Sequence, residues 1–298
     1  MMNMPAHRRR SYVSLRALFQ FIILDKGVKG FPIPNIMMFR YAADRIPVLF
    51  VVMFSMIDFI VYFLVDGVGW LAGYLMIMII PKAVICAWNH HHQHTMTFHA
   101  KPLNRILEFF YALHTGVTTN LWVLHHVLGH HKNFLDQTRD ESGWKRVDGK
   151  GMNALEYTLK IAGTAYYRGY QVGKKHPRVQ RDFLIYSVLT LVGVAVLCWF
   201  RFVPALFVFV FPMVISLLFT AWVTFDHHNG LDTDDAFHAS YNNANPFFNL
   251  LTGNLGYHTA HHYRQGLHWS KLPELHEEIR HRIPSELIRN ARFVLSEA

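Results

Sequence analysis

The chain has 298 residues, of which 52% are hydrophobic and 15% are aromatic, while only 16% are charged. A soluble globular domain carries about 25% charged residues, so the composition argues against a soluble enzyme and for a membrane protein. Cys86 and Cys198, the two cysteines, lie in apolar runs, which excludes an iron–sulfur cluster, a zinc ribbon and a disulfide framework. The net charge of +9 comes without a nucleic-acid-binding motif, so nucleic acid is not an expected partner.

Residues 1–45 are predicted to form an N-terminal interfacial segment. Three arginines at positions 8–10 precede residues 14–24, which are too few and too polar to span a bilayer. We interpret residues 14–24 as an amphipathic helix that lies on the membrane surface. The glycines and prolines between residues 27 and 34 are expected to end it.

Four apolar runs of about 20 residues are predicted to cross the membrane, at residues 46–65, 68–88, 183–200 and 205–225. A turn at Asp66 and Gly67 separates the first two, and a tight turn over residues 201–204 separates the last two. Lys82, near the end of the second run, is expected to extend to the membrane surface. Asp58, within the first run, is either a functional carboxylate or a locally paired one.

The spans are expected to form two hairpins, which puts both termini and the middle of the chain on one side of the membrane. The two outer loops contain a single Lys or Arg, Arg201, so the positive-inside rule makes the opposite side cytoplasmic. The fold class predicted is an all-α membrane protein in one domain. Its parts are the spans within residues 46–226, a cytoplasmic insert at 90–182 and a cytoplasmic helical cap at 227–298. Within the insert, residues 103–128 are predicted to be a half-buried helix or a re-entrant pair.

Three groups of histidines follow the predicted spans and fall on this cytoplasmic side. Imidazole is a good ligand for iron, zinc and copper, and residues three or four apart share one face of a helix. Eight histidines are too many for one ion, so two metals are expected. The first box is His90 and His94, the second is His126, His130 and His131, and the third is His258, His261 and His262.

The other histidines are given smaller roles. His91, His92 and His125 are out of register with the boxes and are interpreted as neighbours of the ligands. A lone histidine is more often a surface or core residue than a ligand. On that ground no catalytic role is assigned to His7, His99, His114, His176, His238, His268, His276 and His281.

The order H-x3-H, H-x3-HH and H-x2-HH around four spans resembles the membrane-bound fatty acid desaturase and hydroxylase superfamily over about residues 46–283. Residues 249–262, with Gly266-Leu-His268-Trp269-Ser270 after them, are similar to the bacterial desaturase-like branch. The second box resembles that of alkane hydroxylases as much as that of desaturases. The resemblance implies a site with two irons, O2 as co-substrate, and a lipid or fatty acyl substrate.

The resemblance also implies one further ligand directly after the fourth span. His227 and His228 occupy this position, and the spacing to Gly230 favours His228. The predicted metal ligands are therefore His90, His94, His126, His130, His131, His228, His258, His261 and His262. Asp226 and Asp232 are expected either to orient histidines or to cap a helix or form an Asx turn.

The expected reaction is oxidation of an unactivated C–H bond in an acyl chain, with desaturation favoured over hydroxylation and oxidative decarboxylation. An oxygenase of carotenoids or sterols would share the site. The chain has no haem or flavin signature, so electrons are expected from an external carrier such as a ferredoxin. The basic middle segment suits an acidic carrier or an anionic lipid, or is only positive-inside charge.

A second class of protein, a metal-binding transporter or sensor, is disfavoured. A transporter places its ligands at mid-membrane in broken helices, whereas these histidines lie at the ends of spans and beyond. The expected location is a bacterial inner membrane with both termini in the cytoplasm.

Overall fold

The computed structural model of the chain describes residues 38–292. The surface helix predicted over residues 14–24, and His7, lie outside the described residues. The described part is mainly helical, with a single pair of two-residue strands.

Four helical stretches in the described part are long and apolar enough to cross a membrane. The first joins a 3₁₀ turn, η1 (Ala42–Asp44), to α2 (Arg45–Leu64), and the second is α3 (Val68–His94). The third is α6 (Pro177–Phe200). The fourth runs without interruption through α7 (Phe202–Ala205), the π-helical η3 (Leu206–Val210) and α8 (Phe211–His228). Four spans were expected from the apolar runs, and four candidates are found.

The last two of these stretches are longer than their apolar runs. Pro177 sits in the first turn of α6, where proline is tolerated because that N–H has no helical partner. The polar residues that follow it are helical, but the apolar run used to predict the span does not include them. The turn before the fourth stretch is Arg201 alone and not residues 201–204, since Pro204 already lies in α7.

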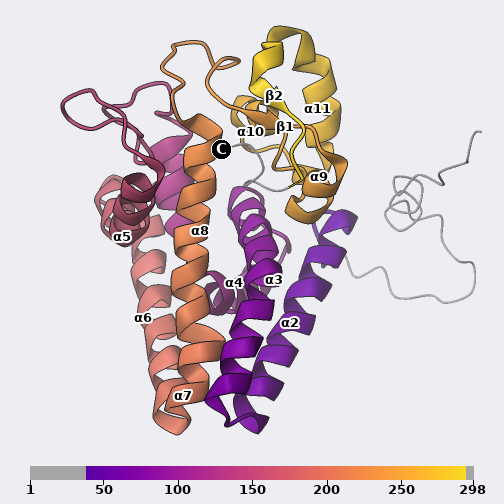
Figure 1. The fold of residues 1–298 in the computed structure, drawn as a ribbon, viewed down its shortest axis with the longest axis vertical. Coiled ribbons are helices and arrows are strands. Elements are labelled where there is room, and N and C mark those ends of the chain that lie inside the picture. Colours follow the sequence, from indigo (N-terminus) through magenta and orange to yellow (C-terminus); the bar gives the residue numbers. More distant parts are fainter. Residues whose placement is uncertain (1–37, 293–298) are drawn as a thin grey trace, which may run out of the picture.

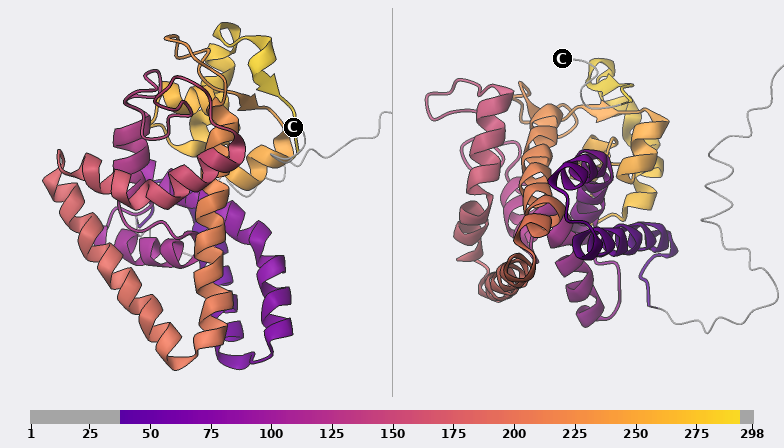
Figure 2. Two further views of the ribbon diagram at one scale, coloured as in Figure 1. Left: turned by 60° about the vertical axis from the view of Figure 1, so that its left-hand side comes forward. Right: turned by 60° about the horizontal axis from the view of Figure 1, so that its bottom comes forward.

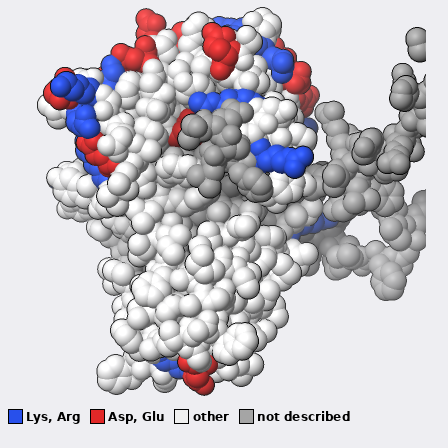
Figure 3. All heavy atoms as spheres, viewed as in Figure 1, with Lys and Arg blue, Asp and Glu red and all other residues white. Residues whose placement is uncertain are grey.

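The connections at residues 65–67 and at Arg201 lie at one end of the helices, at the bottom of Figure 1, and the C-terminal part lies at the other. Between the two ends, the surface is almost free of charged side chains (Figure 3). Large apolar side chains such as Met56, Ile77 and Val188 are exposed in the middle of these helices. An uncharged surface of this kind suits contact with lipid rather than water.

Two shorter elements connect the second and third spans. α4 (Lys101–Thr115) ends at Gly116, which adopts a left-handed φ of 69°. A Cβ at Gly116 would lie 2.5 Å from the carbonyl oxygen of Met213, so α4 packs closely against α8 at this point. The π-helical η2 (Val123–His130) follows. The half-buried helix or re-entrant pair predicted over residues 103–128 is thus a helix, a turn and a π-helix.

The rest of the insert and the C-terminal part surround one end of the spans, as the two views of Figure 2 show. α5 (Ala154–Gly173) is capped by Asn153, whose side chain accepts from the Glu156 N–H, and it packs on η2 and α8. β1 (Asn242–Asn243) pairs in parallel with β2 (Ile288–Arg289). The other elements are α9 (Pro246–Thr252), α10 (His258–Tyr263), η4 (Trp269–Lys271), α11 (Leu272–Ile279), η5 (Arg280–Arg282) and η6 (Ser285–Leu287).

A buried polar cluster lies inside the spans and corrects the expectation for Lys82. Lys82 Nζ donates to Asp58 Oδ2 over 2.6 Å and to the Val208 carbonyl over 3.2 Å, and it lies 3.2 Å from His114 Nδ1. Tyr74 donates to the other oxygen of Asp58 over 2.6 Å. Lys82 is only 1% exposed, so it does not reach the membrane surface. The paired interpretation of Asp58 is the one that the structure supports.

Candidate metal centre

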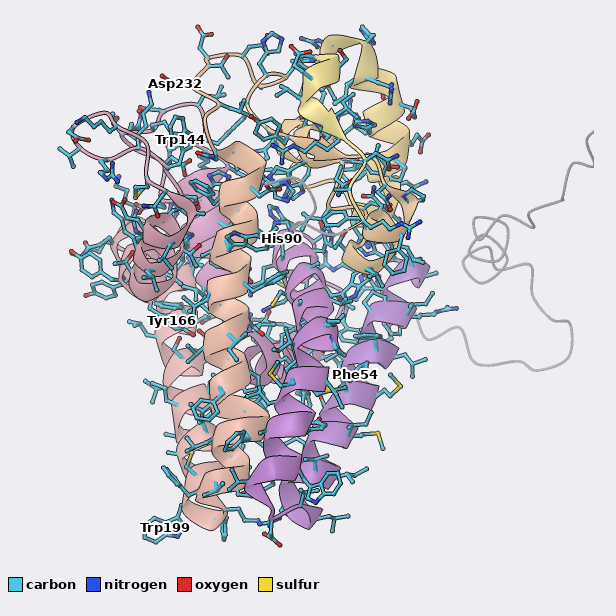
Figure 4. All side chains as sticks on the ribbon, viewed as in Figure 1. Phe54, His90, Trp144, Tyr166, Trp199 and Asp232 are labelled. Carbon is cyan, nitrogen blue, oxygen red and sulfur yellow. The ribbon has the colours of Figure 1, made fainter. Side chains whose placement is uncertain are left out.

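The first box lies on the last turn of α3. His90 and His94 are one turn apart, and their ring centroids are 4.7 Å apart. Figure 4 shows His90 at the upper end of α3, next to α8. The final turn of a helix leaves carbonyl groups without helical partners, and here the Thr95 N–H closes the turn on the His91 carbonyl at 2.9 Å. The box is therefore held in regular helical geometry up to His94.

The second box lies on the π-helix η2. The N–H of His131 donates to the carbonyl of His126, five residues back, over 2.9 Å. This wider turn brings His131 next to His126, with 2.9 Å between their Nε2 atoms. His130 turns the other way, with its Nε2 3.2 Å from that of His228. α-Helical spacing predicted that His126 would pair with His130, and the π-helix pairs it with His131 instead.

The third box lies on the short helix α10, and its residues point to two places. The ring of His261 lies 4.8 Å from that of His90 and 4.5 Å from that of His94. His258 Nε2 lies 3.1 Å from His228 Nε2 and 3.2 Å from His262 Nε2. Thus α10 contributes to both sides of the histidine cluster.

Together these elements form two groups of imidazoles, within each of which the candidate donor atoms lie within 4.8 Å of one another. His258 touches two members of the second group. All nine predicted ligands therefore lie in one cluster, although they come from positions far apart in the sequence. The first group is His90, His94, His126, His131 and His261, and the second is His130, His228 and His262.

The nitrogen contacts fit metal binding better than mutual hydrogen bonding. His126 Nε2 lies 2.8 Å from His90 Nε2 and 2.9 Å from His131 Nε2. One imidazole nitrogen is either a donor or an acceptor, so three rings meeting at such atoms cannot all satisfy one another. A cation bound between them would satisfy all three at nitrogen–nitrogen separations of roughly 3 Å. Both ring nitrogens of His94 and Nε2 of His261 are also buried without a partner.

The protonation state suits the same role. Burial, followed by the charges of neighbouring imidazoles, lowers the pKa of five rings in the second and third boxes well below the usual 6.5. Neutral imidazole is the form that binds a metal ion. The rings concerned are His126, His131, His258, His261 and His262.

Two ligand candidates are oriented through their other ring nitrogen. His130 Nδ1 donates to Asp140 Oδ1 over 2.8 Å, and His228 Nδ1 donates to the Ala239 carbonyl over 2.9 Å. Metal-binding histidines commonly have such partners, which fix the tautomer and the direction of the ring. His227 instead stacks on His258 with 3.9 Å between ring centroids, and neither of its ring nitrogens has a hydrogen-bond partner among the described residues. The geometry therefore favours His228 over His227, as the spacing did.

Asp226 and Asp232 were expected either to orient histidines or to cap a helix or form an Asx turn, and among the described residues neither orients a candidate ligand. Asp226 accepts from Arg289 over 3.0 Å, and Asp232 forms an ion pair with Lys145. Each carboxylate has a cation within reach, and neither is hydrogen-bonded to a ligand candidate. Asp140 was not predicted as a partner of His130, because it lies in a polar turn ten residues after His130 and no periodic pattern marks it.

The histidines next to the first box have their own partners. His91 Nε2 donates to the Thr252 carbonyl over 3.0 Å. His92 lies 2.9 Å from Thr97 Oγ1 and 3.2 Å from Glu108 Oε1. These contacts agree with their interpretation as neighbours of the ligands. His125 is buried, and neither of its ring nitrogens has a partner among the described residues.

His268 also has a structural setting. Its Nε2 donates to Asp44 Oδ1 over 3.0 Å, and the neighbouring Trp269 indole donates to the same oxygen over 2.8 Å. The Gly266-Leu-His268-Trp269-Ser270 segment is thus fastened to the beginning of the first span.

An apolar cavity of about 90 Å³ lies beside the histidine cluster, between α3 and α8. His90, His126 and His258 are among its lining residues, together with Ala83, Cys86, Phe219 and Thr220. The imidazoles therefore border a cavity whose walls are mainly apolar side chains of the spans.

A comparison with known families decides the identity of the chain. The family model described as "Fatty acid desaturase" matches residues 67–291. The chain belongs to the fatty acid desaturase family. No curated protein and no solved structure matches it. Family membership confirms the predicted superfamily, and with the four apolar helices and the histidine clusters it identifies an integral membrane, lipid-modifying oxidoreductase with a metal site.

Proposed function

We propose that this desaturase-family protein inserts a double bond into a fatty acyl or related lipid chain, using O2 and a pair of iron ions. The observation that carries the proposal is the arrangement of two imidazole groups beside an apolar cavity. A lipid chain offers mainly C–H bonds, and a redox-active metal is needed to attack them. Zinc would bind the same nitrogens but has no redox chemistry.

In this proposal the first group holds one iron and the second group, completed by His258, holds the other. The iron pair, when bound, supplies the activation of O2 and the oxidation of a C–H bond. The described residues suit the two ions, since the donor set consists of neutral nitrogens and is almost entirely buried. Asp140 and the Ala239 carbonyl hold the tautomers of His130 and His228 so that each Nε2 faces its group.

The cavity would hold the chain to be oxidised. Its apolar walls exclude water and place one segment of the chain next to His90, His126 and His258. Desaturation, hydroxylation and oxidative decarboxylation differ in which hydrogen is presented and how closely. Desaturation is proposed first because the whole matched region is that of the desaturase family. Hydroxylation is the second candidate because the second box has the H-x3-HH spacing.

We further propose that the four spans form two hairpins in one domain, with the histidine clusters and both termini in the cytoplasm. Support comes from the charge distribution: the connections at residues 65–67 and 201 contain one cation, Arg201, whereas the other end is rich in Lys and Arg. The helical parts at residues 90–182 and 227–298 would then form the cytoplasmic cap, in a bacterial inner membrane.

An external one-electron carrier, such as a ferredoxin, is proposed as the electron donor. The two cysteines are both free and cannot hold an iron–sulfur cluster. Exposed Lys132, Arg139 and Lys175 line a surface pocket next to the C-terminal end of η2. Such a basic surface would attract an acidic carrier.

The test is expression in a host of known lipid composition, followed by mass spectrometry of total lipids and volatile compounds. A new double bond supports desaturation, a hydroxyl group indicates the second candidate, and a shortened terminal alkene indicates decarboxylation. The purified protein should contain about two irons per chain and consume O2 only when a donor and a lipid are present. Zinc or nickel as the bound metal, without oxidation of any lipid, would support a transporter or sensor and contradict the proposal.

A further inference from the structure

Two amides lie beside the first histidine box, each one residue before a predicted ligand. Asn89 precedes His90 and Gln93 precedes His94, so the amides form a stripe on α3 next to the ligand stripe. They are 0% and 4% exposed. A buried amide is costly unless its donors and acceptors are paired, so the partners of this pair indicate what it does.

Gln93 contacts the beginning of η2, which carries the second box. Its Oε1 accepts from the backbone N–H of Trp122 over 3.0 Å and from that of Val123 over 3.4 Å. The first N–H groups of a helix have no partner within it. Trp122, which occupies the N-cap position directly before η2, supplies no side-chain cap. Gln93 therefore caps η2 from a different helix.

Asn89 fixes the direction in which Gln93 points. Gln93 Nε2 donates to Asn89 Oδ1 over 3.0 Å, and Asn89 Nδ2 donates to Thr115 Oγ1 over 3.0 Å and to the Val117 carbonyl over 3.4 Å. Thr115 in turn donates to the Tyr111 carbonyl over 2.8 Å. Because the amide nitrogen of Gln93 is used by Asn89, its oxygen is left to face η2. The chain of bonds begins on α4, crosses α3 and ends on η2.

The register of η2 decides which imidazole serves which group. His131 reaches the first group only because its N–H bonds five residues back to His126. If this turn became α-helical, the His126 carbonyl would bond to the N–H of His130, and the two neighbouring histidines would rotate relative to both groups. A cap that holds the start of η2 on the helix of the first box resists such a change.

We propose that Gln93 is a positioning residue that fixes the second histidine box relative to the first, with Asn89 and Thr115 supporting it. This inference rests on the proposed two-metal centre but assigns a role that family membership does not supply. Gln93 acts through the backbone of η2, since the hydrogen bonds that its side chain makes within residues 38–292 are with the two N–H groups and Asn89.

The experiment compares Gln93→Met, which removes the acceptor at nearly constant length, with Gln93→Glu, which keeps an acceptor oxygen. The matched control is Gln180→Met, because Gln180 also makes one side-chain bond to a backbone group, the Tyr170 carbonyl at 3.0 Å. The full chain is purified in lipid nanodiscs. Backbone hydrogen exchange over residues 122–131 is measured without metal, and metal content and the absorption spectrum are measured after loading with Co²⁺.

Gln93→Met is expected to speed exchange over residues 122–131 by about tenfold, as the loss of a buried hydrogen bond implies, and to change the Co²⁺ spectrum. Gln180→Met is expected to stay within about twofold of the parent protein. Gln93→Glu keeps the acceptor but loses the N–H that Asn89 Oδ1 accepts, so its exchange rate is expected to lie between those of the parent protein and of Gln93→Met. Should Gln93→Met fail to fold, Thr115→Val, which removes the acceptor of both Asn89 Nδ2 and the Val117 N–H, is expected to show the same changes to a smaller degree.

The failures of the two proposals are distinguishable. If the parent protein binds two Co²⁺ ions and Gln93→Met gives the same exchange and spectrum, the role of Gln93 is wrong and the metal centre stands. If the parent protein binds no Co²⁺ at its histidines, the metal centre itself is wrong. A general loss of thermal stability with unchanged exchange over residues 122–131 would also overturn the positioning role.

Discussion

At the scale of the residue, the two ring nitrogens of a histidine in the metal centre have different tasks. In His130, Nε2 lies among the imidazoles of the second group, while Nδ1 donates to the carboxylate of Asp140. The same carboxylate oxygen also accepts from the Ser142 N–H over 2.8 Å. Asp140 therefore both stabilises a turn and orients a candidate ligand, so its loss should lower the affinity for metal.

Asp140→Ala is expected to weaken metal binding by about 10- to 100-fold, the usual effect of removing a partner of a ligating histidine. Asp148→Ala is the matched control, because Asp148 accepts from a backbone N–H two residues later in the same way, at Lys150, but is exposed. Metal affinity measured by competition with a chelator gives the answer. Equal affinities in the two variants would contradict the role of Asp140.

The buried cluster around Lys82 predicts a large effect on stability. Lys82→Met leaves the Asp58 carboxylate buried without its cation, and breaking a buried ion pair costs about 3–5 kcal/mol. The double variant Lys82→Met with Asp58→Leu removes both charges and is expected to regain most of this loss. Thermal unfolding in nanodiscs measures both, with exposed Lys160→Met as the control. A double variant no more stable than the single one would contradict this.

The candidate ligands could be picked out from the sequence, whereas most of their hydrogen-bond partners could not. A histidine repeated every three or four residues is visible in a single sequence because imidazoles are uncommon in apolar segments. Asp140 reaches His130 through the shape of a turn, and Ala239 through a carbonyl that every residue has. Lys82 was placed wrongly because its partner, Asp58, lies in a different span, and hydropathy does not show which faces of two helices meet.

At the scale of the element, the π-helix η2 is the feature that no apolar pattern indicates. Its register depends on backbone hydrogen bonds, on the cap from Gln93 and on the close approach of Gly129, where a Cβ would lie 2.6 Å from Glu141 Cγ. π-Helical turns are rare and are often found at functional sites. The spacing indicated the histidines of the second box as candidate ligands, but it did not indicate that they divide between the two groups.

Gly253 provides a test of how the third box is held against the first. It ends α9 with a φ of 62°, and a Cβ there would lie 2.3 Å from the Trp88 ring. Gly253→Ala is expected to separate the C-terminal part from α3, through backbone strain and a clash with a buried ring. Limited proteolysis should then cleave residues 253–292 faster. Gly266→Ala, where a Cβ meets nothing within 4 Å, is the control, and equal rates would contradict the prediction.

At the scale of the whole molecule, hydropathy located the four long helices because a span must be apolar over about 20 residues. Their ends were less predictable, as α6 shows: its first turn is helical but polar. The pairing of α3 with α8 and the position of the C-terminal part depend on contacts between distant residues, which single-sequence patterns do not contain.

The pH dependence of stability is a property of the whole molecule, because each buried imidazole of the histidine cluster contributes to it. Burial lowers the pKa of imidazoles such as His126 and His262 below their ordinary 6.5, so below pH 6.5 the unfolded chain binds more protons than the folded one. The metal-free protein should therefore be most stable above about pH 6.5 and lose up to about 1.4 kcal/mol per pH unit for each such ring below it. Thermal unfolding between pH 5 and pH 8 measures this, and a flat profile would contradict it.

The turns at the bottom of Figure 1 have a consequence for how the protein enters a bilayer. Arg201 forms an ion pair with Asp66 and also donates to the Val65 carbonyl over 3.4 Å. The guanidinium at the connection between α6 and α7 thus neutralises the carboxylate at the connection between α2 and α3. In the proposed orientation, this end crosses the membrane, and the ion pair leaves it without net charge on which the membrane voltage could act. Replacing Asp66 alone would leave a lone cation there, and the preference for one orientation over the other should weaken.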